Sequence, residues 1–173
     1  MRIVAGRWRG RLIKPPADDR VRPTADRVRE AWMSIVQRDI PAASVLDLFA
    51  GSGALGLEAL SRGARRAEFV DSAAASLRAV RENAEALGAG DEAVITRADA
   101  VRFVGSLEAG AYDVAFADPP YRLGLARQIA ERWLEVPFAR VLGIEHERAE
   151  KLPGTPDTRK YGTVAVSFYR QAE

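Results

Sequence analysis

From Pro41 onward, short apolar segments typical of strands alternate with segments of helical periodicity. Strands are expected at 45–49, 67–71, 93–96, 112–117 and 141–145. Helices are expected at 54–62, 73–87, shortly after Asp99, and 123–134. Repeated strand–helix units predict a parallel sheet covered on both faces, with ligands outside the carboxyl ends of its strands. The final segment, 162–169, follows residues 158–161 through a glycine turn, which predicts that it closes the sheet in the antiparallel direction.

The first forty residues have a different pattern. Two short strands, 2–5 and 11–14, are expected to form a β-ribbon around two glycines. A linker with prolines follows, and then a helix from a Thr24 cap to about Arg38. We therefore divide the chain into a basic N-terminal ribbon and helix, 1–40, and an α/β body, 41–173.

Charge separates these two regions. Residues 1–38 contain ten Arg or Lys against four Asp or Glu, whereas the remainder contains sixteen against twenty. This polarity predicts a basic face for a polyanion on a body that is not basic. We therefore expect that removal of residues 1–21 leaves small-ligand binding by the body largely intact but abolishes action on the polyanion.

Several classes of protein are excluded by composition. The chain has no cysteine and one histidine, His146, which rules out thiol catalysis, cysteine-ligated zinc and a multi-histidine metal site. We expect no metal. No apolar run approaches the roughly 18 residues that span a bilayer, so we expect no membrane segment.

A glycine-rich loop, GSGALG at 51–56, follows one predicted strand and opens a helix, as in nucleotide-binding folds. Asp71 ends the next strand, at the position of a ribose-binding acid. Asp47 ends the first strand and is expected to lie near the centre of the ligand. A carboxylate there repels the pyrophosphate of NAD but complements the sulfonium and ammonium groups of S-adenosylmethionine. A capping or solvated role for Asp47 stays open.

Asp99 follows the third strand in the sequence RADA. Its carboxylate can accept a hydrogen bond from an adenine amine, and Ala100 can supply a backbone N–H. Asp99 can also cap the helix that follows it, and the two roles are compatible.

The tetrapeptide Asp118-Pro119-Pro120-Tyr121 directly follows the fourth strand. The lone pair of an exocyclic amine on a nucleobase is delocalised into the ring, so the amine is a poor nucleophile. The Asp118 carboxylate and the Pro119 carbonyl can accept its two N–H hydrogens and direct the lone pair, on a backbone that consecutive prolines make rigid. Tyr121 can stack on the extruded base; for that role its ring face suffices, so a Tyr121→Phe variant is expected to retain most activity.

These motifs resemble those of the class I, Rossmann-like S-adenosylmethionine-dependent methyltransferases. The matching residues are DLFAGSG at 47–53, Asp71, Asp99, and the tetrapeptide 118–121. The segments RIVAGRWRGR, RPTADRVREA and FAGSGALGLEALSRGA further resemble the bacterial 16S ribosomal RNA guanine-N2 methyltransferases of the RsmD type. The resemblance covers nearly the whole chain.

The resemblance implies a doubly wound, mostly parallel seven-stranded α/β sheet with the N-terminal ribbon and helix added to it. It implies a monomeric cytoplasmic enzyme that methylates a guanine of 16S rRNA within the 30S subunit or a late assembly intermediate. The implied catalytic residues are Asp118, Pro119 and Tyr121. The implied S-adenosylmethionine-binding residues are Asp47, Phe49, Gly51, Ser52, Gly53, Asp71, Asp99 and Ala100. The implied RNA-binding residues are Arg7, Trp8, Arg9, Arg11, Arg22 and Arg27.

Three alternatives remain open at this point. The same tetrapeptide serves methylation of other planar amines, such as adenine N6 of DNA or a protein glutamine. A catalytically idle RNA-binding assembly module is a second alternative, which an intact tetrapeptide disfavours. An NAD-dependent oxidoreductase is the third, and the charge of Asp47 opposes it.

Overall fold

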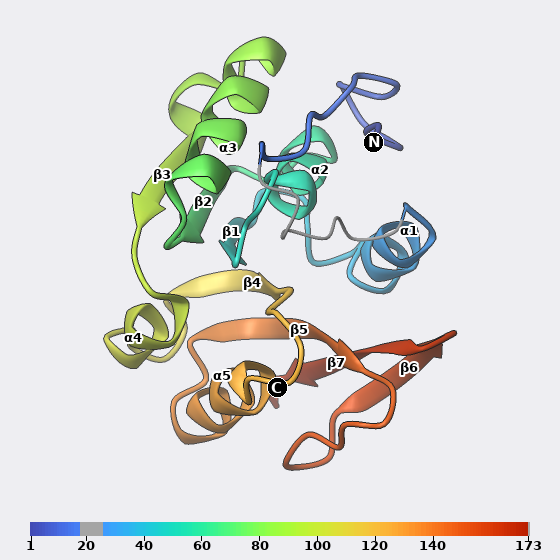
Figure 1. Ribbon diagram of the computed structural model, residues 1–173, viewed down its shortest axis with the longest axis vertical. Coiled ribbons are helices and arrows are strands. Elements are labelled where there is room, and N and C mark those ends of the chain that lie inside the picture. Colours follow the sequence, from blue (N-terminus) through green and yellow to red (C-terminus); the bar gives the residue numbers. More distant parts are fainter. Residues whose placement is uncertain (18–25, 173) are drawn as a thin grey trace.

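Seven strands form one continuous sheet in the order β3-β2-β1-β4-β5-β7-β6 (Figure 1). The computed structural model describes residues 1–17 and 26–172. The strands are β1 Ser44–Leu48, β2 Arg66–Asp71, β3 Ala93–Arg97, β4 Tyr112–Ala117, β5 Ala139–Glu147, β6 Asp157–Tyr161 and β7 Val164–Arg170. The α-helices are α1 Asp26–Ile35, α2 Ala54–Ser61, α3 Ala74–Leu87, α4 Ala100–Gly105 and α5 Leu125–Glu135, and a 3-10 turn, η1, spans Gly90–Glu92.

The strand order reverses direction between β1 and β4. Strands β1 to β5 pair in parallel, whereas β7 runs antiparallel to both β5 and β6. This arrangement confirms the expected doubly wound, mostly parallel sheet. In such sheets a crevice opens outside the carboxyl ends of the strands where the order reverses, here at the ends of β1 and β4.

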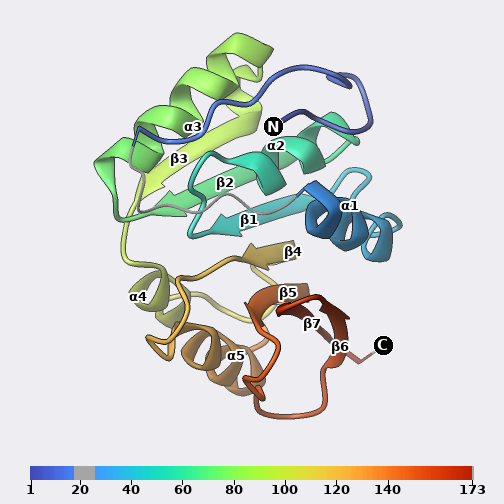
Figure 2. The ribbon, with the colours of Figure 1, turned by 45° about the vertical axis from the view of Figure 1, so that its right-hand side comes forward.

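Helices cover both faces of the sheet (Figure 2). One core cluster joins apolar residues of α1, α2 and α3 to one face, and a second joins α4 and α5 to the other. Alternating side chains of one strand enter different clusters: Phe116 of β4 packs in the first and Ala117 in the second. Trp32 of α1 is fully buried in the first cluster, where it meets Phe116 edge to face with ring centroids 5.6 Å apart.

The expected N-terminal ribbon is not a regular pair of strands. Its two arms pair at one antiparallel bridge, between Arg2 and Leu12, where the Ile3 N–H donates to the Arg11 carbonyl and the Ile13 N–H to the Met1 carbonyl. Between them the backbone N–H groups of Val4 and Ala5 turn away from the opposite arm and donate to the carboxylate of Glu58 on α2. The antiparallel pairing of the two arms is thus confirmed, but the predicted strand bounds were wrong: the pairing ends after Ile3, because the Ala5 N–H donates to Glu58 and the Arg11 N–H donates to the Trp8 carbonyl. The Thr24 cap lies outside the described residues.

Candidate active site

A cleft of about 480 Å³ opens at the carboxyl end of the sheet. Its volume is within the range typical of small-ligand sites. The lining residues come from the β1–α2 loop, the turn after β2, the end of β3 and the loop after β4. They are Phe49, Gly51, Asp71, Ser72, Ala73, Ser76, Asp99, Asp118, Pro119, Pro120, Tyr121 and Leu125.

The β1–α2 loop has a tightly constrained backbone. Phe49 adopts a left-handed conformation with φ 57°, which is rare for a residue with a side chain and stores strain that the surroundings must hold. Gly53, at φ 81°, precedes the first turn of α2. The N–H of Gly51 donates to Asp71 over 3.1 Å, so the loop is fastened to the end of β2.

Asp71 holds two backbone segments at once. Its Oδ2 accepts from the Gly51 N–H, and its Oδ1 accepts from the Ala73 N–H over 2.9 Å. The side chain remains partly exposed and lines the cleft. Asp71 is therefore fixed in orientation by the backbone while facing the space in which a ligand would lie.

Asp47 lies behind the glycine loop and does not line the cleft. Its side chain is 2% exposed, and its Oδ2 accepts from the Gly56 N–H of α2 over 2.9 Å. Burial raises the pKa of Asp47 to about 8; the charge of Asp71 adds to this, and the Gly56 hydrogen bond opposes it. The expectation of an Asp47 carboxylate facing the ligand's centre is corrected: the side chain supports the loop from within the core. Because Asp47 is buried away from the cleft lining, its charge gives little reason to exclude NAD.

Asp99 caps α4, with Oδ2 accepting from the Arg102 N–H over 3.0 Å, and it also lines the cleft. Both roles considered for Asp99 are thus geometrically compatible. Ala100 is buried and lies outside the cleft lining.

The loop after β4 forms the opposite wall. Asp118 is partly exposed, Pro119 is buried and Tyr121 is partly exposed, and all three line the cleft. The Tyr121 hydroxyl donates to Oε2 of Glu145 on β5 over 3.0 Å. Glu145 is 1% exposed, whereas Tyr121 lines the cleft, so this hydrogen bond is partly buried.

The cleft brings together most of the predicted ligand-binding and catalytic residues. Asp47, Ser52, Gly53 and Ala100 are the exceptions, since none of them lines it. Sequence reasoning missed Ser72, Ala73 and Ser76, which follow β2, and Leu125, which begins α5. Ser72 and Ala73 were open to prediction, because the turn after the ribose-binding acid lies at the same edge of the sheet.

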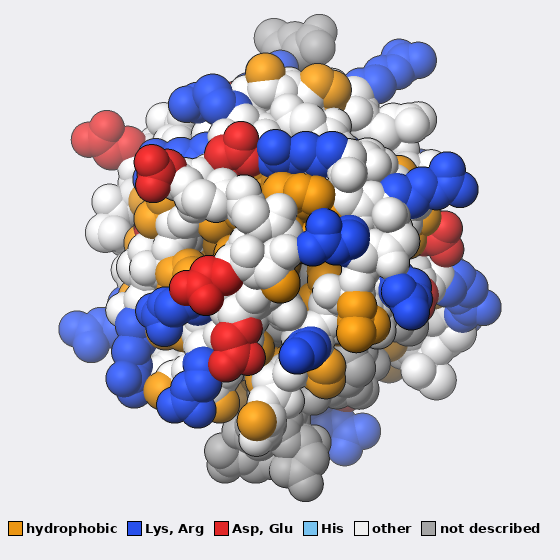
Figure 3. Space-filling model, turned by 90° about the horizontal axis from the view of Figure 1, so that it is seen from above, with side chains coloured by type: hydrophobic (Ala, Val, Ile, Leu, Met, Phe, Trp, Pro, Cys, Tyr) orange, Lys and Arg blue, Asp and Glu red, His pale blue; other side chains and the backbone are white. Residues whose placement is uncertain are grey.

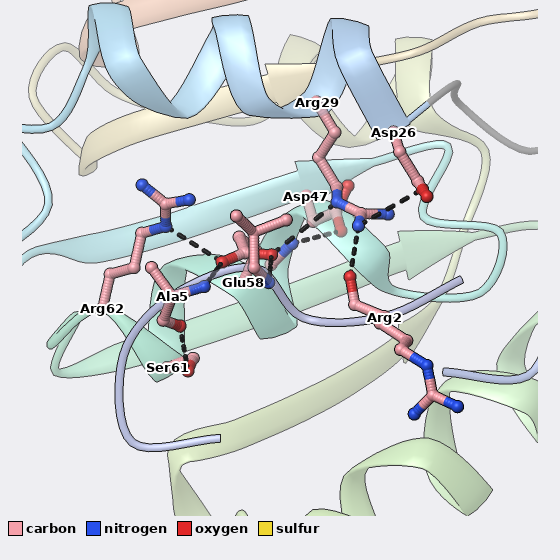
Figure 4. A network of polar contacts seen from close by, with 10 residues as sticks. Arg2, Ala5, Asp26, Arg29, Asp47, Glu58, Ser61 and Arg62 are labelled. Carbon is pink, nitrogen blue, oxygen red and sulfur yellow. Dashed lines mark hydrogen bonds and ion pairs between the residues drawn. The ribbon is translucent and has the colours of Figure 1, made fainter. Parts of the chain in front are cut away.

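The N-terminal segment, residues 1–17, is anchored on α2 through a buried carboxylate (Figure 4). Glu58 is fully buried; it accepts the Val4 and Ala5 amides over 2.9 and 3.1 Å and the Arg62 guanidinium over 2.9 Å. The buried Arg29 of α1 approaches the same carboxylate at 3.7 Å and donates to the Arg2 carbonyl. One acid therefore ties together α1, α2 and the N-terminal segment.

A second contact places Gly6 against the end of α2. Ser61 accepts the Arg7 N–H at its carbonyl, and its hydroxyl donates to the Ala5 carbonyl. A Cβ on Gly6, which has φ 90°, would lie 1.9 Å from the Ser61 carbonyl oxygen, so no side chain fits there. Ile3 and Ile13, each 1% exposed, belong to the core cluster of α1 and α2. Removal of residues 1–21 would thus open the core, contrary to the expectation of an independent ribbon.

The predicted RNA-binding arginines within the described residues are exposed: Arg7, Arg9, Arg11 and Arg27. Arg7 pairs with Glu92, and Arg11 donates to the Ala86 carbonyl. Seen from above, basic side chains are spread among acidic ones rather than gathered in one continuous patch (Figure 3). Arg22 lies outside the described residues.

Trp8 is 7% exposed and packs in the core cluster. The Arg7 guanidinium lies 4.2 Å from the centre of its ring. This placement argues against the expected stacking of Trp8 on a base.

His146 is buried on β5 within a chain of hydrogen bonds. Its Nδ1 lies 2.9 Å from the Glu147 carbonyl, and its Nε2 lies 2.7 Å from the Ser167 hydroxyl. Among the residues that the structure describes, no group of three or more His, Asp or Glu side chains is arranged to hold a metal ion. Within the same residues, no helix is long and apolar enough to cross a membrane.

A profile of the family described as "Conserved hypothetical protein 95" matches residues 1–170. This chain belongs to that family. Among the relatives, "Ribosomal RNA small subunit methyltransferase D" of Escherichia coli strain K12 is 40% identical over 128 residues, which are 74% of this chain and 64% of that protein. The chain thus spans less than two thirds of that relative's length.

Two further similar proteins match over nearly their full length. "Putative rRNA methyltransferase YlbH" of Bacillus subtilis strain 168 is 33% identical over 183 residues, covering 99% of each protein. The solved structure described as "Putative methyltransferase yhhF from Escherichia coli" has a TM-score of 0.84 and 33% identity, covering 99% of this chain and 97% of that one. The likeness to this solved structure therefore extends over the N-terminal segment as well as the sheet.

Proposed function

We propose that the chain transfers a methyl group from S-adenosylmethionine to the N2 amine of a guanine in 16S ribosomal RNA. The observation that carries this proposal is the meeting of Asp71, Asp99 and Asp118 around one cleft. The first two stand where a nucleoside would be bound, and the third belongs to the tetrapeptide suited to an exocyclic amine. The names of the relatives in Escherichia coli and Bacillus subtilis support rRNA methylation.

The cleft fits the proposed cofactor in its donor and acceptor groups. Asp71 is held by two backbone amides so that its carboxylate can accept from ribose hydroxyls at the cleft. Asp99 lies at the cleft for an adenine amine, and the ring of Phe49 lines the wall beside the glycine loop. When bound, S-adenosylmethionine supplies a methyl group made electrophilic by its sulfonium.

The residues after β4 act on the target base. Asp118 and the Pro119 carbonyl accept the two N–H hydrogens of the guanine amine, so that the nitrogen lone pair points at the methyl carbon. The nitrogen–carbon bond forms as the sulfur–carbon bond breaks. The amine then loses one of the two protons that are hydrogen-bonded to Asp118 and the Pro119 carbonyl. Tyr121 provides a ring face for the extruded guanine.

The proposed substrate is the 30S subunit or a late assembly intermediate, and the proposed place of action is the cytoplasm. The chain is proposed to act as a monomer. Arg9 and Arg27 are exposed and are the proposed phosphate contacts, with Arg7 and Arg11 also bound to protein partners. Residues 1–40 retain their proposed role on the RNA side, although they share a core with the body.

The test is methyl transfer from labelled S-adenosylmethionine to 30S subunits isolated from cells that lack the protein. Digestion of the RNA and mass spectrometry should find label in N2-methylguanosine alone. Label in N6-methyladenosine or in protein would contradict the proposal and favour another planar amine. Absence of any transfer, with intact RNA binding, would favour an assembly module without catalysis.

A further inference from the structure

The loop of residues 118–124, here named the catalytic loop, is fastened to the neighbouring strand at two points. Tyr121 donates to Glu145, and the Arg122 guanidinium pairs with Glu147 at 3.0 Å. Both glutamates lie at the carboxyl end of β5. Ala117, the last residue of β4, pairs with Ile144, so Glu145 stands level with Asp118.

The two attachments differ in their surroundings. Glu145 is 1% exposed, whereas the Arg122 side chain is 86% exposed. A hydrogen bond to a carboxylate is stronger than a neutral one, and low local dielectric strengthens it further. An ion pair in water contributes little, because solvent and salt screen it. The attachment to the buried Glu145 is less screened by solvent than the exposed ion pair and should therefore dominate the position of the loop.

We propose that Glu145 is a positioning residue for methyl transfer: through the Tyr121 hydroxyl it fixes the ring that receives the base. The inference rests on the proposed function and extends it to a residue outside the tetrapeptide. Tyr121 follows Asp118 by three residues, so a fixed ring also holds Asp118 and the Pro119 carbonyl at a constant distance from the base plane. The Tyr121 hydroxyl thus holds the ring in position, a role that the prediction from ring stacking alone did not include.

The backbone of the catalytic loop makes such an anchor necessary. Arg122 has φ 67° and Gly124 has φ 71°, so two residues just after Tyr121 adopt the left-handed backbone conformation. The left-handed conformation is unfavourable for arginine and persists where surrounding contacts impose it. The hydrogen bond from Tyr121 to Glu145, one residue before Arg122, is a partly buried contact that can impose it. Loss of the bond should let the loop relax away from the cleft.

The experiment compares single-turnover methyl transfer to unmodified 30S subunits at saturating S-adenosylmethionine. Tyr121→Phe and Glu145→Ala should each slow the transfer about tenfold or more, because misplacement of reacting groups is costly. Glu145→Gln retains an acceptor oxygen and should recover most of the rate. The double variant Tyr121→Phe/Glu145→Ala should be no more than about twofold slower than the slower single variant, since each single variant already removes the hydrogen bond between Tyr121 and Glu145.

Arg122→Ala is the matched control, because it breaks the exposed attachment of the same loop. It should change the rate by less than about twofold. Affinity for S-adenosylhomocysteine should stay near that of the wild type in all variants, which a general loss of structure would not allow. Amide hydrogen exchange of residues 121–124 should accelerate in Glu145→Ala and stay slow in Glu145→Gln, in protein without RNA.

Tyr121→Phe with a wild-type rate, or rate losses that multiply in the double variant, would overturn the inference while leaving the proposed function intact. A wild-type protein that transfers no methyl group would contradict the proposed function instead. The exchange measurement needs no activity, so it decides the anchoring separately. Unchanged exchange in Glu145→Ala would overturn the inference even in an inactive protein.

Discussion

The cleft and the N-terminal segment are built in opposite ways. At the cleft, backbone amides hold the side chain of Asp71, which turns toward the ligand space. At the N-terminal segment, the buried side chain of Glu58 holds the backbone, and the arginines turn toward solvent. At the cleft a functional side chain is therefore held in one orientation. At the N-terminal segment the backbone is held in place, and the arginine side chains remain exposed. Catalysis should therefore be sensitive to single cleft residues, and RNA binding should be distributed over many arginines.

The largest effect is expected from Asp118→Asn. The amide keeps the shape of the side chain but can turn donor hydrogens toward the target amine. Lost alignment and a lost charge-assisted hydrogen bond should slow methyl transfer by roughly 10² to 10⁴-fold. Single-turnover kinetics on 30S subunits measure this rate, and calorimetry should show that S-adenosylhomocysteine affinity changes much less. An equal loss of S-adenosylhomocysteine affinity and of transfer rate would show that Asp118 binds the cofactor rather than the target amine.

Glu58→Ala should have the largest effect on stability. It removes the buried acid that faces Arg29, leaving this arginine the exposed Asp26, and it leaves two backbone amides without their acceptor. Breaking such a buried pair costs about 3 to 5 kcal/mol in the free energy of unfolding. Urea denaturation measures this loss, with Glu131→Ala on the exposed face of α5 as the control. A loss below about 1 kcal/mol would show that the N-terminal segment is not anchored through Glu58.

Asp47 should give the protein an unusual pH dependence. Its pKa is about 8 in the folded state and near 3.8 when unfolded, so between these values the folded state binds one more proton. The stability that Asp47 contributes is complete below about pH 4 and is lost as pH rises to about 8. The slope is about 1.4 kcal/mol per pH unit. Asp47→Asn should remove this slope from denaturation curves, and an identical slope in both proteins would contradict the burial of a titrating acid.

Asp71→Ala should weaken S-adenosylhomocysteine binding by about 1 to 3 kcal/mol, because ribose hydroxyls lose a charged acceptor. The glycine loop also loses its bond to β2, which adds to the effect. Calorimetry measures the affinity. Asp91→Ala, at an exposed acid in η1, is the control and should bind normally. Unchanged affinity in Asp71→Ala would show that the nucleoside does not bind at this end of the cleft.

The smallest effect is expected from single N-terminal arginines. Arg9→Ala should weaken RNA binding a few-fold and reduce the slope of log affinity against log salt by about one. Arg7→Ala should do less, because Arg7 already pairs with Glu92. Filter binding at several salt concentrations measures both. If the slope of log affinity against log salt is unchanged in Arg9→Ala, Arg9 does not contact an RNA phosphate.

The sequence predicted the sheet, its mostly parallel direction and the acids at its carboxyl edge, because strand–helix alternation and motif spacing determine where such residues meet. It failed on Asp47, since a residue at the end of a strand can point to either face and spacing does not say which. It also failed on the N-terminal segment. Charge showed which side chains would be exposed, but nothing in the sequence marks Glu58 as the acid that binds another segment's backbone.

The most direct test of the account is the modification state of 16S rRNA in cells that lack the protein. Primer extension and mass spectrometry should show one guanine without its N2 methyl group, restored by the wild-type chain and not by Asp118→Asn at equal expression. A 16S rRNA with all its N2-methylguanines in the deletion strain, or full restoration by Asp118→Asn, would contradict the account.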